Sequence, residues 1–159
     1  RRPRPDVREV HAGDVIQGIG WTITVGHAQH VQPQLECLAY RLDSSIGSVC
    51  YSGDSGLCDE LIELAHECDV LIMMNHHYSG TEPSESYRRA CGNHVDNAEV
   101  AQRAGVKMLV LTHLLSQIDQ AGVREAIVHE IRKVYTGTVV WGEDLLELRL
   151  PRTAVAASI

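Results

Sequence analysis

The stretch Ser48-Val49-Cys50-Tyr51-Ser52-Gly53-Asp54-Ser55-Gly56 decides the fold of this chain. It runs an apolar strand into a glycine-flanked turn that presents one carboxylate, that of Asp54. An aspartate in such a turn either shapes the turn or binds a ligand. Two histidines help to decide between these readings, because His30 follows an earlier strand-like segment and His113 follows the apolar run Val106–Leu111.

These three residues all stand where strands are expected to end. Imidazole and carboxylate groups gathered at strand ends are how an open α/β scaffold assembles a site for a divalent metal ion. His27 competes with His30 for this role. The two lie three residues apart on an extended segment and point to opposite faces, so at most one should be a direct ligand. His30 is favoured because it precedes the turn into the next strand.

The pattern of apolar residues predicts alternating strands and helices through the latter two-thirds of the chain, which is typical of an α/β fold. Asn75–Gly92 is polar and reads as a long loop of the kind that often lines a site. Strands are expected at 14–17, 21–25, 37–42, 48–52, 70–74, 106–111, 138–141 and 145–150, and helices at 58–67, about 93–104 and 122–135.

Several segments together resemble the later metal motifs of the metallo-β-lactamase superfamily, in its ribonuclease Z and arylsulfatase-like branch. The matching segments are His30 to Pro33, Ala39 to Asp43, Tyr51 to Ser55, and Ala104 to His113. The resemblance covers most of 13–150 and implies a four-layer αββα sandwich with a two-metal hydrolytic site. It assigns His30 and His113 as metal ligands and Asp54 as the carboxylate that bridges both metals.

The implied activity is hydrolysis by a metal-bound hydroxide, on a small-molecule ester, sulfate or phosphodiester. Two divalent ions are expected, with zinc as the first choice for histidine and carboxylate ligands; manganese or iron also fits, since no thiolate is involved.

The opening His-x-His-x-Asp-His motif of the superfamily is absent from the sequence, although it contains nine histidines. The chain therefore resembles the second half of the sandwich. Residues 13–150 are expected to form this half, 1–12 a linker or exposed stretch, and 151–159 a tail. The first half of the fold, on the same or a separate chain, is an expected partner, and a homo-oligomer is also expected.

The proton donor is the least determined part of the site. The ribonuclease Z pattern has a His-Glu pair and a His-Ser-Thr triplet where this chain has Met73-Met74 and Cys91-Gly92-Asn93. His94 is the first candidate replacement, because it stands at a helix start; His77 and then His76, on the preceding loop, follow. Surface positions for the two loop histidines are the competing interpretation.

Charge and cysteine content restrict the partners and the compartment. The net charge of −7 argues against nucleic-acid binding, for which a basic patch is the usual footprint. Five cysteines without a Cys-x-x-Cys pair indicate reduced thiols and a cytoplasmic protein. No stretch approaches the roughly 20 apolar residues of a membrane span.

Four other functions stay open. One is a hydrolytic dehalogenase of the same superfamily, to which the Cys91-Gly92 pair is similar. The second is a tRNA 3′-processing nuclease like ribonuclease Z. The third is a non-catalytic partner half or assembly module. The last is a phosphate-binding α/β domain, which is poorly supported because no glycine-rich phosphate motif follows a strand.

Overall fold

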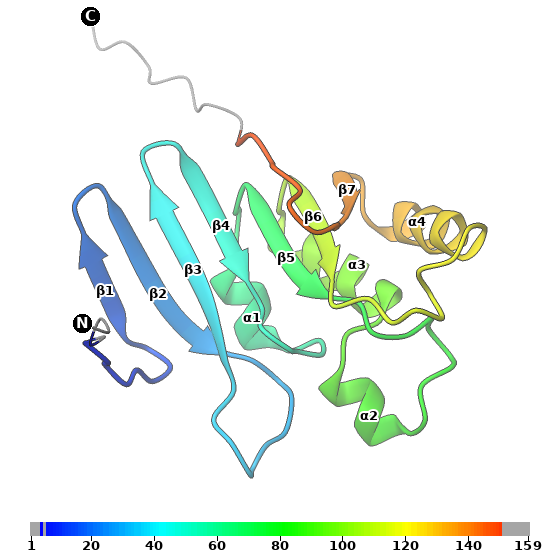
Figure 1. Ribbon diagram of the computed structural model, residues 1–159, viewed down its shortest axis with the longest axis horizontal. Helices are drawn as coiled ribbons and strands as arrows, with labels where there is room; N and C mark the ends of the chain where they lie inside the picture. Colours follow the sequence, from blue (N-terminus) through cyan, green and yellow to red (C-terminus); the bar gives the residue numbers. More distant parts are fainter. Residues whose placement is uncertain (1–3, 5, 151–159) are drawn as a thin grey trace, which may run out of the picture.

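In the part of the chain that the structure describes, seven strands form one mixed sheet, in sequence order from β1 to β7 (Figure 1). The computed structural model describes residue 4 and residues 6–150. The strands are β1 (Val15–Gly18), β2 (Trp21–His27), β3 (Leu38–Ser44), β4 (Gly47–Tyr51), β5 (Val70–Met74), β6 (Met108–Thr112) and β7 (Thr138–Trp141). The helices are α1 (Asp59–Leu64), α2 (Glu85–Ala90), α3 (His94–Ala104) and α4 (Val123–Val134).

The sheet changes from antiparallel to parallel at β4. Strands β1 to β4 pair antiparallel as successive neighbours, whereas β4 to β7 pair parallel through connections that contain helices. Parallel neighbours require such crossovers, while antiparallel neighbours can be joined by tight turns. The carboxyl ends of β4, β5 and β6 consequently meet at one edge of the sheet. The predicted α/β class is confirmed.

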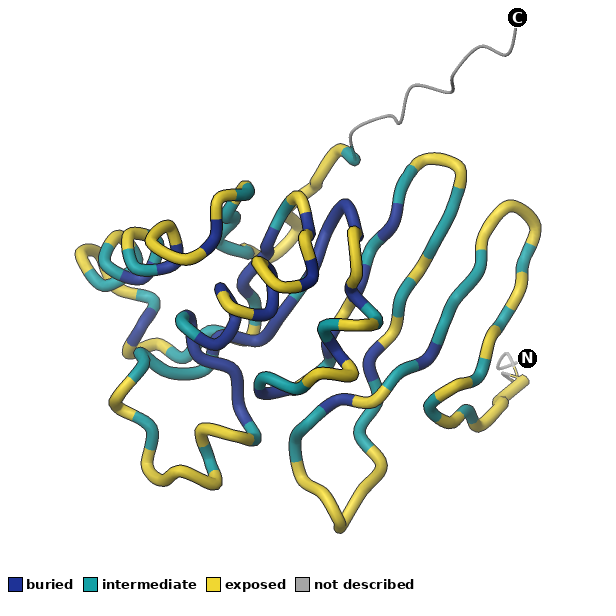
Figure 2. The backbone as a smooth tube through the Cα atoms, turned by 180° about the vertical axis from the view of Figure 1, so that it is seen from behind, coloured by how far each residue is buried: buried dark blue, intermediate teal, exposed yellow. Residues whose placement is uncertain are grey.

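Helices α1 and α3 cover one face of the sheet, and α4 packs beside α3 (Figure 1). The register sets Cys50, Leu71 and Leu109 side by side on this face, and all three side chains are fully buried. Ile127 and Ile131 of α4 are buried in the same core. Figure 2 shows the dark blue of buried residues concentrated in this layer between sheet and helices.

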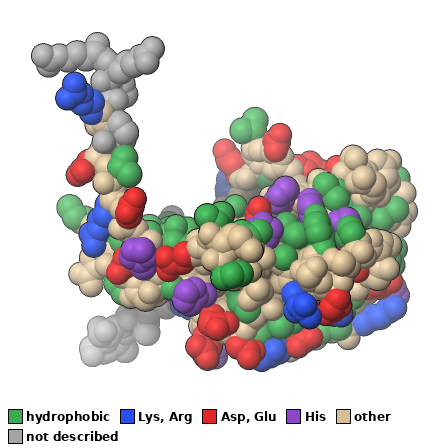
Figure 3. All heavy atoms as spheres, turned by 90° about the horizontal axis from the view of Figure 1, so that it is seen from below, with side chains coloured by type: hydrophobic (Ala, Val, Ile, Leu, Met, Phe, Trp, Pro, Cys, Tyr) green, Lys and Arg blue, Asp and Glu red, His purple; other side chains and the backbone are tan. Residues whose placement is uncertain are grey.

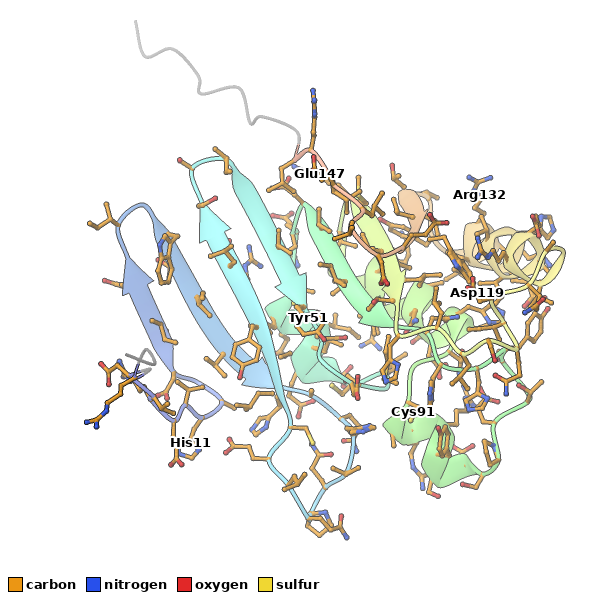
Figure 4. All side chains as sticks on the ribbon, viewed as in Figure 1. His11, Tyr51, Cys91, Asp119, Arg132 and Glu147 are labelled. Atoms are coloured by element: carbon orange, nitrogen blue, oxygen red, sulfur yellow. The ribbon has the colours of Figure 1, made fainter. Side chains whose placement is uncertain are left out.

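The opposite face of the sheet is apolar and partly open. Tyr40, Leu42 and Tyr51 on this face remain 36%, 38% and 46% exposed. Figure 4 shows Tyr51 standing on this open side. Half of a four-layer sandwich would leave one face of its sheet uncovered in this way.

Two elements differ from the sequence prediction. Residues 145–150 were expected to be a strand, but the structure has none there. Leu145 has a positive φ of 64°, which breaks the extended conformation, and Leu146 and Leu148 turn towards Ile72 and Val110 on the open face.

Helix α2 was also missed, because 75–92 was read as loop throughout. It begins at the cap Ser84, whose hydroxyl accepts the Tyr87 N–H, and carries arginines in its last turn. Both are standard helix-end signals.

All five cysteines are free, as expected. Within the described residues, no helix combines the length and the apolar character that crossing a bilayer requires. The predicted tail 151–159 lies outside the described residues, whereas residue 4 and residues 6–12 of the predicted N-terminal stretch are described and are mostly exposed.

Candidate metal centre

Asp54 is presented by the turn that ends β4. Gly53 has a φ of 60°, and a Cβ there would meet the Leu38 carbonyl oxygen at 3.0 Å, so glycine suits the position. Ser52 and Ser55 on either side of this turn are fully buried. The turn is therefore anchored on both sides, while the Asp54 side chain itself stays 43% exposed.

His113 follows β6 at the same edge of the sheet and faces Asp54. Its Nε2 lies 3.6 Å from Asp54 Oδ2. The His113 backbone has a φ of 52°, in the left-handed region that costs energy for any residue with a Cβ. Strain of this kind concentrates at functional sites.

His30 reaches this edge through the segment that runs beside the Asp54 turn. The Gln29 N–H donates to Ser55 Oγ over 3.0 Å, and the Gly56 N–H donates to the Gln29 carbonyl over 2.8 Å. His30 Nδ1 lies 2.6 Å from the Ala90 carbonyl oxygen, which can only accept, so Nδ1 carries the proton. His30 Nε2 is then left with a free lone pair, as a metal ligand needs.

His27 lies elsewhere. It lines a shallow cavity on the helix side together with Glu60 and Leu64. Of the two histidines, the structure thus brings His30 and not His27 to the Asp54 turn.

His76 and His77 follow β5 and join the same cluster. The His76 ring lies 5.0 Å from the His113 ring and 5.2 Å from the His77 ring, centroid to centroid. Burial lowers the pKa of His76, and the neighbouring imidazoles of His113, His77 and His30 lower it further, while the Asp54 carboxylate raises it. Figure 3 looks onto this end of the molecule and shows histidines gathered among hydrophobic side chains.

Tyr87 of α2 contacts His76 through its hydroxyl and its ring. Its hydroxyl lies 2.8 Å from His76 Nδ1, and the two rings are stacked with centroids 5.9 Å apart. Burial, and then the neighbouring Cys91 thiol, raises the pKa of the Tyr87 phenol. Sequence reasoning missed Tyr87 because α2 itself was missed.

His94 lies apart from this cluster. It is fully buried, with Nε2 2.7 Å from Glu130 Oε2 and with Nδ1 accepting the Ser79 N–H over 3.3 Å. Both ring nitrogens are therefore occupied inside the protein. This differs from the expectation that His94 offers a proton to a substrate, because a donor needs an accessible nitrogen.

The oxygen and nitrogen atoms of Asp54, His113 and His30 are of the kind that binds a divalent ion, but they do not enclose a binding site. Asp54 and His113 present an oxygen and a nitrogen 3.6 Å apart, and the tautomer of His30 suits a ligand. Among residue 4 and residues 6–150, however, no three His, Cys, Asp or Glu side chains converge closely enough to hold a metal ion. The described residues thus present donor atoms at this edge without forming a closed group of ligands.

Comparison with known proteins decides the family. A family model described as the beta-lactamase superfamily domain matches residues 2–114, a range that includes Asp54 and His113. The chain belongs to this superfamily. The structure also resembles the metallo-beta-lactamase fold protein YhfI from Bacillus subtilis, with a TM-score of 0.69 and 25% identity, over 84% of this chain and 52% of that one. The sheet and its helices are accordingly part of the metallo-β-lactamase fold, as the sequence predicted.

Curated relatives with similar sequences are ribonucleases Z. The enzyme of Methanosarcina mazei is 36% identical over 110 residues, which are 65% of this chain and 33% of the relative. That of Mycobacterium tuberculosis is 30% identical over 148 residues, or 90% of this chain and 54% of the relative. The chain thus spans between a third and about half of the length of these two relatives. Human tRNase Z, short form, shares the fold, with a TM-score of 0.63 at 16% identity.

Proposed function

We propose that this beta-lactamase superfamily chain supplies one half of a two-metal hydrolase. The observation that carries the proposal is the pair of donor atoms on Asp54 and His113, 3.6 Å apart at the carboxyl ends of β4 and β6. His113, His30 and Asp54 would hold the ions, with Asp54 between the two. Zinc suits this donor set best, and manganese or iron also suits it.

A divalent ion bound by these residues would lower the pKa of a water molecule and so provide a nucleophile at neutral pH. The protein groups around this ion would orient its ligands and polarise them. The Ala90 carbonyl fixes the ring of His30, since a ligand histidine is normally held by a hydrogen bond to its other nitrogen.

We assign His76 as the residue that donates a hydrogen bond to the leaving group, with His77 as the second candidate. In this proposal the Tyr87 hydroxyl, 2.8 Å away, is the donor to His76 Nδ1. The proton of a neutral His76 ring is then on Nε2, the opposite tautomer to that of His30. A neutral imidazole N–H aimed at the reacting centre stabilises negative charge that develops on a departing oxygen. His94 acts in this scheme as a buried support for the loop.

The remaining ligands would come from a His-x-His-x-Asp-His loop on the first half of the fold, in the same or a separate polypeptide. Two observations support this proposal: the apolar face of the sheet that is partly open, and the absence of a closed three-ligand group among the described residues. Such a half would cover the open face and complete the coordination shell.

A small-molecule ester, sulfate or phosphodiester is the proposed substrate, in a cytoplasmic protein. Met73 and Met74 are buried at the strand position where the ribonuclease Z pattern has its His-Glu pair, and the net charge of −7 disfavours a polyanion.

Precursor tRNA is the second candidate substrate, and the sequence similarity to ribonucleases Z favours it. Hydrolytic dehalogenation and a non-catalytic role as an assembly module are the remaining alternatives.

A substrate panel tests the proposal. The zinc-loaded protein, with both halves of the fold present, is assayed on p-nitrophenyl acetate, p-nitrophenyl sulfate, bis(p-nitrophenyl) phosphate and a precursor tRNA, with and without a chelator. We expect turnover of at least one small substrate that the chelator abolishes and that His113→Ala removes. Cleavage of precursor tRNA alone would favour the nuclease, and an inactive protein that binds no metal would contradict the hydrolase.

A further inference from the structure

An apolar cavity adjoins the candidate metal centre. Its volume is about 580 Å³; His76 and His77 form one wall, and the apolar side chains Leu115, Ile118, Val123 and Ala126 line much of the rest. It lies between the loop that follows β5 and the segment that joins β6 to α4. Ligands of α/β proteins bind preferentially at this end of parallel strands. The two histidines make the cavity continuous with the cluster around His113.

The wall of the cavity is held rigidly in place. The Tyr78 hydroxyl donates to Glu130 of α4, whose other carboxylate oxygen lies 2.7 Å from Nε2 of the buried His94. The Thr81 hydroxyl donates to the Tyr78 carbonyl over 2.7 Å. The loop after β5 is therefore tied to both α3 and α4 by hydrogen bonds that fix the wall of the cavity.

The lining of the cavity selects against charged ligands. No Lys, Arg, Asp or Glu is among its described lining residues, and the neutral polar side chains Thr81 and Gln117 complete it. A buried phosphate would find no cation there, which makes the cavity unsuited to a nucleic-acid backbone. A second cavity, on the other side of His113, does contain charged residues, among them Arg124, Asp119 and Glu143.

We propose that this cavity binds the uncharged aryl or branched alkyl part of a small-molecule substrate whose scissile bond lies beside His76. The inference rests on the proposed hydrolytic function and specifies its substrate class. A volume of about 580 Å³ is within the range of small-molecule sites and accommodates more than one aromatic ring.

Binding is tested first, independently of turnover. The metal-loaded protein, with both halves of the fold and labelled at its methyl groups, is titrated with 1-naphthol, an uncharged aryl alcohol. We expect saturable shifts of the methyl resonances of Leu115, Ile118 and Val123. Ala126→Phe fills the cavity and should abolish these shifts, and Gln117→Trp, at the exposed rim, should weaken them without disturbing the core. His129→Phe adds a ring to an exposed position of α4 and should change nothing.

Selectivity is tested second, by comparing kcat/KM for 1-naphthyl acetate with that for methyl acetate. Ala126→Phe should lower the ratio of these two values roughly tenfold or more, while His129→Phe leaves it unchanged. Cavity shifts in a protein that hydrolyses neither these esters nor any member of the substrate panel would keep the ligand class and reject the hydrolytic function. Hydrolysis without cavity shifts, or shifts that survive in both Ala126→Phe and Gln117→Trp, would overturn the inference. So would precursor tRNA cleavage that neither 1-naphthol nor Ala126→Phe affects.

Discussion

Two hydrogen bonds give the histidines of the site different roles. The Ala90 carbonyl accepts from His30 Nδ1 and leaves Nε2 for the proposed metal, whereas the donation that we propose from the Tyr87 phenol puts the proton of His76 on Nε2. In the proposed site, histidines that look equivalent in a sequence thus take the different roles of a ligand and a hydrogen-bond donor through their neighbours.

Removal of the Tyr87 hydroxyl should slow the departure of the leaving group and leave the metal content unchanged. We expect Tyr87→Phe to lower kcat about tenfold to a hundredfold, as the loss of a partner that orients a site histidine does. The effect should be larger for a substrate with a poor leaving group, because more negative charge develops on the departing oxygen. Tyr51→Phe, on the open face of the sheet, is the matched control.

His94 provides the contrasting result. Because His94 is buried against Glu130, His94→Ala should slow substrates with good and poor leaving groups equally. A selective loss on the poor leaving group in His94→Ala, together with normal selectivity in Tyr87→Phe, would return the donor role to His94.

Sequence reasoning found Asp54 and His113 because each directly follows an apolar strand, a signal contained in consecutive residues. It could not find Tyr87, whose contact with His76 depends on the orientation of a short helix. The start of that helix was nonetheless readable, since Ser84 followed by Glu85 is a common N-terminal signal.

At the scale of elements, Asp69 holds three strands in register. Its carboxylate precedes β5, accepts from the Ser48 N–H of β4 over 2.8 Å, and lies 2.6 Å from Lys107 Nζ, just before β6. Burial alone raises the pKa of Asp69, but the Lys107 ammonium and the Ser48 groups outweigh it and hold the pKa below its usual value.

Asp69→Asn should therefore lower the free energy of unfolding by about 1–3 kcal/mol at pH 7, measured by urea denaturation. The folded state binds the proton less readily than the unfolded state. The stabilisation by Asp69 is thus complete above the unfolded pKa near 4 and is lost as the pH falls through the lower, folded pKa. The difference between wild type and Asp69→Asn should shrink over that acidic range. A difference that grows on acidification would contradict the assignment.

The order of most strands along the chain could be predicted from the sequence, but the conformation of residues 145–150 could not. Gly18 to Gly20 and Ser44 to Gly47 mark hairpins locally. Residues 145–150 have the composition of a strand, but Leu146 and Leu148 instead line a cavity with Ile72 and Val110 on the open face. That outcome depends on the apolar surface offered by distant strands, which a local pattern does not contain.

At the scale of the whole molecule, the open sheet face should make the isolated 159-residue segment associate with itself. An exposed apolar surface of this extent favours association, because association removes it from water. Replacing Leu42 and Tyr51 together by lysine should shift the segment towards monomer in sedimentation experiments. Ile19→Lys, in the turn between β1 and β2, should not. A wild-type segment that is monomeric at high concentration and holds two ions tightly would contradict the proposed second half.

The metal content of Asp54→Ala, measured by plasma emission on the protein with both halves of the fold, tests the central claim most directly. A carboxylate between two ions holds the pair together, so the variant should lose roughly one or both ions and its hydrolytic activity. Asp59→Ala, which removes only an exposed pair with Arg103, should keep its metal. Full metal content in Asp54→Ala would contradict the account.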